Sequence, residues 1–319
     1  MNLSKLVRAD FGSDLAILEE YSFKEKLAGF FSLVRPIFLL LTPLNAASAA
    51  LLSIGDLPSW EGCAAGFATG LFGAAGVNIF NRYADSERDK VLWPSRPIPG
   101  GRVKRNQALV LAILAYAAAL ALNWVFFNPL SFFILLAAMI LGSLYSSFLR
   151  DRVGYLSLPP IEGLIFLCGW ACLAPDTVFT SLLPWYLYFM GVVWQSAHIL
   201  AHYVLNIRHA EGRPPISTPL LFSRPSPQTA SKMTLGFTIL LLGMGLWLTR
   251  LTPLSYLYLV PVAVAGIYTL LQCRAFWKSA SDERQMHRAW SSLSLFRLII
   301  SAAIILAVIF QYPILDLRF

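Results

Sequence analysis

The sequence predicts an all-α integral membrane protein in which nine transmembrane helices form a single bundle around a central cavity that opens near the cytoplasmic face. The first supporting observation is composition: 57% of the 319 residues are hydrophobic and only 13% are charged, with a mean hydropathy of +0.63. Soluble domains contain about 25% charged residues. The other two observations are the length of the apolar segments and the one-sided distribution of Lys and Arg.

A helix needs about 20 predominantly apolar residues to cross a bilayer. The chain contains nine such segments, at residues 30–54, 61–80, 107–127, 130–148, 155–174, 181–205, 234–250, 253–273 and 292–312. No linker between them is long enough to divide the chain. Residues 1–319 are therefore predicted to form a single domain.

The basic residues are distributed unevenly between the two sides of the predicted membrane. If the N-terminus is cytoplasmic, all but two of the 25 Lys and Arg residues lie on the cytoplasmic side, the exceptions being Arg250 and Arg318. This positive-inside asymmetry predicts a multi-pass protein with a cytoplasmic N-terminal segment, residues 1–28, which lacks a signal-peptide pattern. The net charge of +8 then reflects membrane topology, and no nucleic-acid partner is expected.

A dense run of charged residues and turn formers, "NRYADSERDKVLWPSRPIPGG" (81–101), follows the second apolar segment. Asn81, Asp85 and Asp89 recur at i, i+4 and i+8, so on a helix they form one stripe. Their side chains are hard oxygen donors, which suit Mg²⁺ bound together with substrate phosphates. A solvated helix end is the simpler alternative, but acidic groups at membrane depth usually mark function.

Cations surround this stripe and are predicted to neutralise phosphate oxygens, with arginine suited to bidentate contacts. The candidates for substrate binding are Arg82, Lys90 and Arg96, with Arg88 beside them. The arrangement indicates a metal-bound phosphate at the edge of an apolar pocket.

The run resembles the first signature of the UbiA superfamily of intramembrane prenyltransferases, Asn-x-x-x-Asp-x-x-x-Asp followed by an Arg-Pro-Leu/Ile-Pro turn. Asn81, Asp85 and Asp89 fill the ligand positions, while Arg82 stands where many members have Asp. The resemblance extends to "RP" at 35–36 and to "YSSFLRDR" at 145–152, which contains Arg150. It implies nine membrane helices, an isoprenoid diphosphate substrate bound by these residues, and Mg²⁺ held by the stripe.

The family's second signature, typically Asp-x-x-Asp-x-Glu-Gly-Asp, corresponds to "NIRHAEGR" at 206–213. Glu211 matches, and the resemblance implies that it is a metal ligand and catalytic residue. The aspartate positions hold Asn206, His209 and Arg213, which puts a full second metal site in doubt. Arg213 is a candidate to supply positive charge to the diphosphate directly.

His198, His202 and Asn206 lie at i, i+4 and i+8 in the sixth apolar segment. Three interpretations remain open: hydrogen bonding inside the bundle, a zinc site completed by His209 and Glu211, or a cavity-lining role. In the last, His202 is a candidate catalytic proton acceptor or cation stabiliser, and His198 and Asn206 contact the substrate.

Two further polar residues lie in apolar segments. Glu162 is a substrate-binding candidate by default because intramembrane carboxylates usually mark function, although a structural ion pair with Arg150 or Arg152 is the alternative. Asn45 is a weaker candidate of the same kind. The four cysteines all lie in or beside apolar segments, where buried small side chains are expected rather than disulfides.

The expected function is Mg²⁺-dependent ionisation of an isoprenoid diphosphate and transfer of the prenyl group to an aromatic or other small acceptor, with membrane lipid around the bundle. The alternative is a terpene cyclase on the same scaffold, in which the substrate's own double bond captures the cation. A transporter or a non-catalytic scaffold is less favoured, because charge is concentrated at one face rather than spread through the spans.

Overall fold

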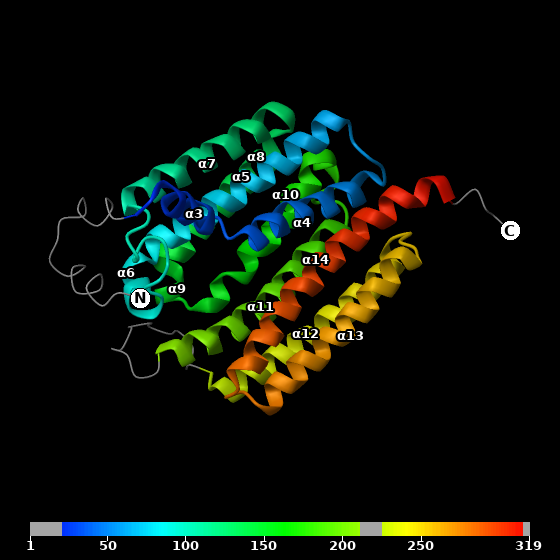
Figure 1. Cartoon of the computed structure of the whole chain (residues 1–319). Coiled ribbons are helices and arrows are strands. Elements are labelled where there is room, and N and C mark those ends of the chain that lie inside the picture. Colours follow the sequence, from blue (N-terminus) through cyan, green and yellow to red (C-terminus); the bar gives the residue numbers. More distant parts are fainter. Residues whose placement is uncertain (1–20, 211–224, 315–319) are drawn as a thin grey trace.

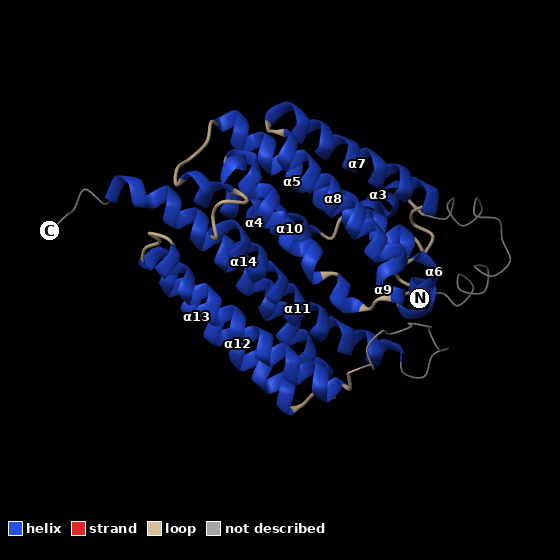
Figure 2. Ribbon diagram, turned by 180° about the vertical axis from the view of Figure 1, so that it is seen from behind, coloured by secondary structure: helices blue, strands red, loops and turns tan. Residues whose placement is uncertain are grey.

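The computed structural model describes residues 21–210 and 225–314, and every regular element in these ranges is helical (Figures 1 and 2). One long helix lies at each of the nine predicted segments. They are α4 (Pro36–Ile54), α5 (Trp60–Ala84), α7 (Arg105–Phe126), α8 (Pro129–Leu144), α10 (Pro159–Leu173), α11 (Leu183–Ala210), α12 (Pro227–Leu251), α13 (Tyr256–Lys278) and α14 (Glu283–Ile314). Short helices connect them: α3 (Phe23–Leu33), α6 (Ser86–Leu92), α9 (Arg150–Arg152) and single turns at 145–149, 155–157 and 175–177.

Seven helices in the described part of the chain are long and apolar enough to cross a membrane. In α4 the apolar stretch is shorter, Leu39–Ile54. The helix α11 is not among the seven, and it carries the polar residues Gln195, His198, His202 and Asn206. Large apolar side chains such as Trp124 and Val264 are more than half exposed on the outer surface, as expected where lipid covers the bundle. The chain is an integral multi-pass membrane protein.

Small residues let the central helices approach closely. A Cβ atom added to Gly70 of α5 would lie 2.7 Å from the backbone of Pro43 in α4. A Cβ added to Gly169 of α10 would lie 2.1 Å from the carbonyl oxygen of Ala46. Both sites require glycine, because membrane helices associate through close packing of small residues. These contacts hold α4 between α5 and α10.

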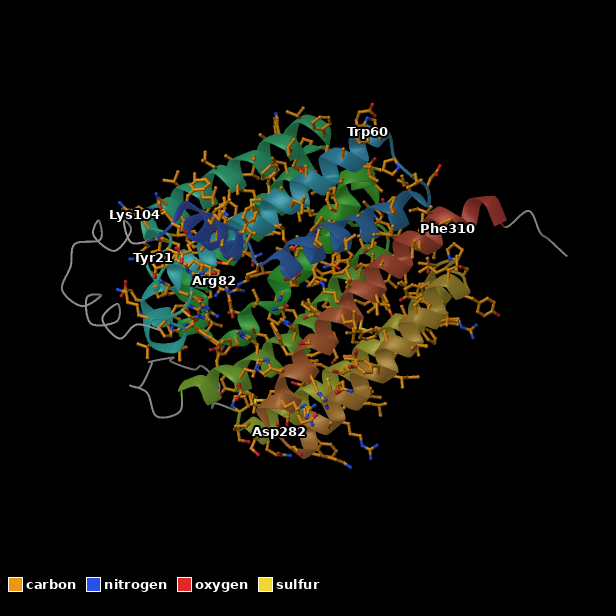
Figure 3. The ribbon with its side chains drawn as sticks, in the orientation of Figure 1. Tyr21, Trp60, Arg82, Lys104, Asp282 and Phe310 are labelled. Atoms are coloured by element: carbon orange, nitrogen blue, oxygen red, sulfur yellow. The ribbon has the colours of Figure 1, made fainter. Side chains whose placement is uncertain are left out.

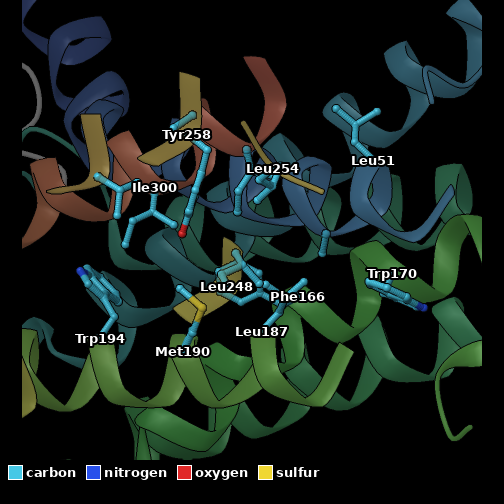
Figure 4. Close-up of a cluster of buried hydrophobic side chains, with 14 of the residues drawn as sticks. Leu51, Phe166, Trp170, Leu187, Met190, Trp194, Leu248, Leu254, Tyr258 and Ile300 are labelled. Atoms are coloured by element: carbon cyan, nitrogen blue, oxygen red, sulfur yellow. The ribbon is translucent and has the colours of Figure 1, made fainter. Parts of the chain in front are cut away.

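The largest buried apolar cluster lies mainly among the helices α10, α11, α12, α13 and α14 (Figure 4). Phe166 and Trp170 of α10 meet Leu187 and Met190 of α11, and α12, α13 and α14 close the cluster from the opposite side. Full burial of a large apolar side chain contributes about 1.5–3 kcal/mol in water. Within lipid the corresponding gain comes from packing contacts, so this cluster is a rigid wall for the neighbouring cavity.

The helix α3 positions the loop that carries Arg96. It begins at a capping box formed by Ser22 and Glu25, and a Cβ added to its Gly29 would lie 3.1 Å from the Val103 side chain, so the two elements pack closely there. The Tyr21 hydroxyl donates a 2.8 Å hydrogen bond to the carbonyl oxygen of Gly100. The loop between α6 and α7 is thereby fixed to the end of the bundle.

Candidate active site

The predicted stripe lies at the joint between two helices rather than on one uninterrupted helix. The helix α5 ends at Ala84, and α6 begins at Ser86, with Asp85 between them at φ −80° and ψ −4°. The i to i−4 hydrogen bonds continue through the joint, from the Asp85 amide to Asn81 at 2.9 Å and from the Asp89 amide to Asp85 at 2.8 Å. The helical register of the stripe is therefore kept.

The Asp85 carboxylate is buried, with 3% of the residue exposed, and two guanidinium groups bind it. Arg150 donates to Oδ1 at 2.6 Å, and Arg88 lies 2.9 Å from Oδ2. Burial alone would raise the pKa of Asp85, but Arg88 and Arg150 outweigh that effect and hold the pKa below its ordinary value. Asp85 is therefore ionised at neutral pH.

The Asp89 carboxylate is also buried, at 1% exposed, and lies behind two cavity-lining arginines. Arg96 binds its Oδ1 at 2.5 Å, and Arg82 Nη1 lies 3.9 Å from its Oδ2. The Arg96 guanidinium also stacks over the Trp93 ring at 4.7 Å, which fixes its plane. Asp89 itself does not line the cavity.

The Asn81 amide connects the stripe to two other helices. Its Oδ1 accepts a 2.9 Å hydrogen bond from Arg35 Nη2, and its Nδ2 donates to Ser146 Oγ at 3.3 Å. Among the described residues Arg35 is the one non-glycine residue with a positive φ, 52°, and such strained positions often occur at functional sites. Burial, and then the nearby Arg96 charge, lower the pKa of Arg35 to about 10, so it remains cationic at neutral pH.

We define the guanidinium cluster as these five arginines and the two aspartates, Arg35, Arg82, Arg88, Arg96, Arg150, Asp85 and Asp89. Counted over the described residues, its charges do not balance: Arg82, Arg88, Arg96 and Arg150 contact the two carboxylates, and Arg35 adds a fifth cation on Asn81. An unbalanced buried charge is strongly unfavourable unless a counter-ion is bound. The cluster is suited to an anion of about three negative charges.

The cluster lies at one end of a cavity of about 870 Å³. Cavity-lining residues of α5 extend from Trp60 to Arg82, which at 1.5 Å per residue is about 33 Å of helix. Figure 3 shows Arg82 and Trp60, both of which line the cavity, at opposite ends of the bundle. The wall between them is mostly apolar and includes Phe67 and Met139. The cavity matches an anionic head group followed by a long hydrocarbon chain.

The sequence candidates divide by their position relative to this cavity. Those that line it are Asn81, Arg82, Asp85, Arg96, Arg150, Glu162, His198, His202 and Asn206. Lys90 does not; its ammonium pairs with the exposed Glu87 at 2.9 Å. Asn45 is fully buried behind the wall, where Ser301 donates to its Oδ1 at 2.5 Å. Glu211 and Arg213 lie outside the described residues.

The expected partners of Glu162 were wrong. Its Oε1 accepts a hydrogen bond from Arg297 of α14, while Arg150 binds Asp85. Residue 297 lies 135 positions along the chain from Glu162, so no local pattern indicated the pair. Arg88, predicted among the cations that neutralise phosphate oxygens, lines the cavity. Arg35 was absent from the predicted substrate-binding residues.

The histidines of α11 are part of an aromatic stack. The His198 ring lies 4.7 Å from Trp194 and 5.5 Å from Trp290, and His202 lies 6.0 Å from Trp290. Asn206 Nδ2 lies 3.2 Å from His202 Nδ1. Residues 21–210 and 225–314 contain no group of three or more His, Cys, Asp or Glu side chains placed to bind a metal, and Glu211, which the zinc hypothesis requires, lies outside the described residues. All four cysteines are free.

The oxygen donors of the stripe nevertheless fit Mg²⁺. The Asp89 Oδ2 atom is buried and has no hydrogen-bond partner among the described residues, and buried polar atoms without a partner often mark a binding position. Asp85 adds a second carboxylate and Asn81 an amide oxygen, although Arg35, Arg88 and Arg150 contact those atoms. One or two carboxylates plus substrate phosphates are the usual Mg²⁺ ligands.

Comparison with known sequences gives a consistent assignment. The UbiA prenyltransferase family profile matches residues 40–314. A digeranylgeranylglyceryl phosphate synthase from Methanospirillum hungatei is 32% identical over 45% of this chain, and the match spans about half of that protein, 51%. A protoheme IX farnesyltransferase from Pseudarthrobacter chlorophenolicus is 23% identical over 88% of this chain and 89% of its own length.

Solved structures share the fold at low sequence identity. A UbiA homologue from Aeropyrum pernix in its apo form has a TM-score of 0.69 at 17% identity, covering 84% of this chain and 97% of its own. A UbiA homologue from Archaeoglobus fulgidus bound to DMAPP and Mg²⁺ has a TM-score of 0.62 at 16% identity, covering 88% of this chain and 98% of its own. The family match covers most of the chain and includes the helix joint, the arginines on both sides of it and the cavity. The chain therefore belongs to the UbiA prenyltransferase family.

Proposed function

We propose that the protein ionises an isoprenoid diphosphate inside the membrane and transfers the prenyl group to a small acceptor. The observation that carries this proposal is the connection of a buried, positively charged cluster to an 870 Å³ apolar cavity. Ligand pockets are usually about 300–1,000 Å³, so this cavity is large enough for a long hydrocarbon chain. Related folds have been solved with DMAPP or GPP together with Mg²⁺.

The diphosphate is bound by the guanidinium cluster. Arg82 and Arg96 line the cavity and neutralise negative charge that grows on the leaving diphosphate as the allylic carbon–oxygen bond breaks. Asp85, Asp89 and Asn81 would hold Mg²⁺, which when bound supplies further positive charge to the leaving group. Arg88 and Arg96, which contact the carboxylates here, are then close enough to turn toward the phosphate oxygens.

The apolar wall protects the resulting allylic cation. Water is excluded by Met139 and its neighbours, which reduces capture of the cation by hydrolysis. The hydrocarbon tail lies along the glycine face of α5, past Gly73 and Gly66 toward Trp60. With the N-terminus on the cytoplasmic side, as the Lys and Arg distribution favours, the diphosphate is released to the cytoplasm.

The proposal is tested by following pyrophosphate release from geranyl diphosphate and Mg²⁺ with the full chain in lipid nanodiscs. Asp85→Asn and Asp89→Asn are expected to reduce the rate by at least a hundredfold. The matched control is Asp176→Asn, an exposed carboxylate away from the cavity, which should leave the rate unchanged. Unaltered turnover in both Asp85→Asn and Asp89→Asn would refute the proposal.

A terpene cyclase is the second candidate, and the apolar cavity next to the cluster supports it because ionisation is common to both reactions. Incubation with a prenyl diphosphate alone separates the two. Transfer predicts that turnover depends on an added acceptor. A cyclic hydrocarbon formed without an acceptor would favour the cyclase.

A further inference from the structure

The cavity has a second polar region, separate from the guanidinium cluster. It lies on α10, α11 and α14, and we define this alcove by the cavity-lining residues Glu162, Trp194, Gln195, His198, Trp290 and Arg297. Glu162 belongs to the first turn of α10, which follows Arg150 after a short connection and so begins at the same end of the bundle as the cluster. The alcove therefore faces the half of the cavity in which the diphosphate would lie.

Glu162 presents a free carboxylate oxygen to the cavity. Its side chain is 18% exposed, whereas that of Arg297 is 5% exposed. Arg297 donates to Oε1, and no described residue donates to Oε2. The Arg297 guanidinium also lies 4.0 Å from the centroid of the Trp194 ring, which fixes the ion pair in place. Oε2 is thus available to accept a hydrogen bond or a proton from a molecule in the cavity.

Gln195 is a second polar group that lines the alcove. The residue is 5% exposed, it lines the cavity, and its side-chain amide has no hydrogen-bond partner in the described part of the chain. The helices α10 and α11 approach closely, since a Cβ added to Gly191 would lie 3.3 Å from Gly163 Cα. This contact places the α11 segment that carries Gln195 beside the α10 segment that carries Glu162. Both side chains line the cavity, so one ligand in the alcove can form hydrogen bonds with the two of them.

The alcove also has a flat aromatic wall. His198 stacks on Trp194 with an angle of 21° between the rings, and Trp290 continues the stack at 30° to His198. The Trp194 Nε1 atom donates a 2.8 Å hydrogen bond to the carbonyl oxygen of Leu293, which fixes the indole. Aromatic walls of this kind favour flat ligands that stack or pack edge to face.

We propose that this alcove is the acceptor subsite, that it binds a neutral, flat molecule with an O–H group, and that Glu162 Oε2 takes the proton of that group. The inference rests on the proposed prenyl transfer. The carbon–oxygen bond of the donor breaks and its electron pair leaves with the diphosphate. The acceptor forms the new bond to the allylic carbon, and its proton passes to Glu162.

The charges of the cavity support a neutral acceptor. Glu162 and Arg297 form a neutral pair, so the alcove has no excess positive charge to attract an anion. An anionic acceptor would also face the free Oε2 oxygen and would bind preferentially to the guanidinium cluster. A purely structural ion pair between Glu162 and Arg297 would not require the open amide of Gln195.

The test measures binding by fluorine NMR with the full chain in nanodiscs, using 4-fluorophenol, 4-fluoroanisole, which lacks the O–H group, and 4-fluorobenzoate, which is anionic. The wild-type protein is expected to bind 4-fluorophenol at least tenfold more tightly than the other two. Glu162→Gln, which retains an oxygen for Arg297, should remove this preference, and Glu162→Asp should restore part of it. Gln195→Met, a variant of similar size, should weaken 4-fluorophenol binding about threefold or more.

Donor binding is measured in the same samples so that the two proposals fail separately. With Mg²⁺ present, geranyl diphosphate affinity should stay within twofold in Glu162→Gln and Gln195→Met, and it should fall in Asp85→Asn, which loses a metal-binding carboxylate, while the 4-fluorophenol preference remains. The inference is overturned if wild type does not prefer 4-fluorophenol, or if the preference persists in Glu162→Gln and Gln195→Met. A failure of geranyl diphosphate to bind wild type would instead refute the proposed function.

Discussion

The charge excess of the guanidinium cluster predicts that the protein binds inorganic pyrophosphate even when Mg²⁺ is removed with EDTA. Over the described residues the cluster combines five arginines, four of which contact its two carboxylates, for a net charge of three positive before any metal is added. The perturbation is Arg82→Gln. Arg82 is chosen because its Nε and Nη1 atoms are buried without hydrogen-bond partners and it lines the cavity.

The magnitude follows from the contacts that Arg82 can offer. A hydrogen bond between charged groups contributes about 1.5–3 kcal/mol, and loss of one such bond weakens affinity by roughly 10- to 150-fold, since each 1.4 kcal/mol is a factor of ten. Arg82→Gln should weaken metal-free pyrophosphate binding within this range. Asp85→Asn should strengthen it, because removal of a carboxylate raises the net positive charge.

Isothermal titration calorimetry in EDTA measures these affinities. The matched control is Arg274→Gln, an exposed arginine on α13, which should bind pyrophosphate as wild type does. The reasoning is refuted if wild type binds no pyrophosphate without Mg²⁺, or if Arg82→Gln and wild type bind equally. Weaker metal-free binding by Asp85→Asn would also contradict it, because the carboxylate would then be assisting the anion.

Three further predictions concern packing, substrate length and pH. Gly169→Ala should lower the unfolding temperature, because its Cβ would meet the Ala46 carbonyl oxygen at 2.1 Å and overpacking costs about 1–3 kcal/mol. The control is Gly236→Ala, whose Cβ would have nothing within 4 Å and which should leave the unfolding temperature unchanged. Gly66→Phe should shift donor preference toward shorter prenyl diphosphates in a competition assay, since the new ring fills the cavity between Trp60 and the cluster. The folded-state pKa of Asp85 lies below its ordinary value of 3.8, so its ionised form stabilises the fold at neutral pH and that contribution is lost as pH falls through the folded pKa. The stability difference between wild type and Asp85→Asn should therefore shrink in acid, and a constant difference from pH 7 to acid would contradict this.

The sequence alone located the helices and the i, i+4, i+8 spacing of the stripe. Apolar length decides where a chain can cross a bilayer, because every backbone polar group in lipid must be bonded within the helix. Each of the nine predicted segments contains a helix for this reason. The i, i+4, i+8 spacing likewise placed Asn81, Asp85 and Asp89 at the same end of the bundle, since helical register is a local property.

Only the tertiary structure decided which charges meet. Arg35 reaches Asn81 across 46 positions, and Arg297 reaches Glu162 across 135, and no periodicity within a helix encodes contacts between helices. The same packing turned Lys90 away, placed Asp89 behind two arginines, and left Gln195 open to the cavity. A local pattern fixes which face of a helix a side chain occupies, whereas the neighbour on that face depends on how the other helices close around it.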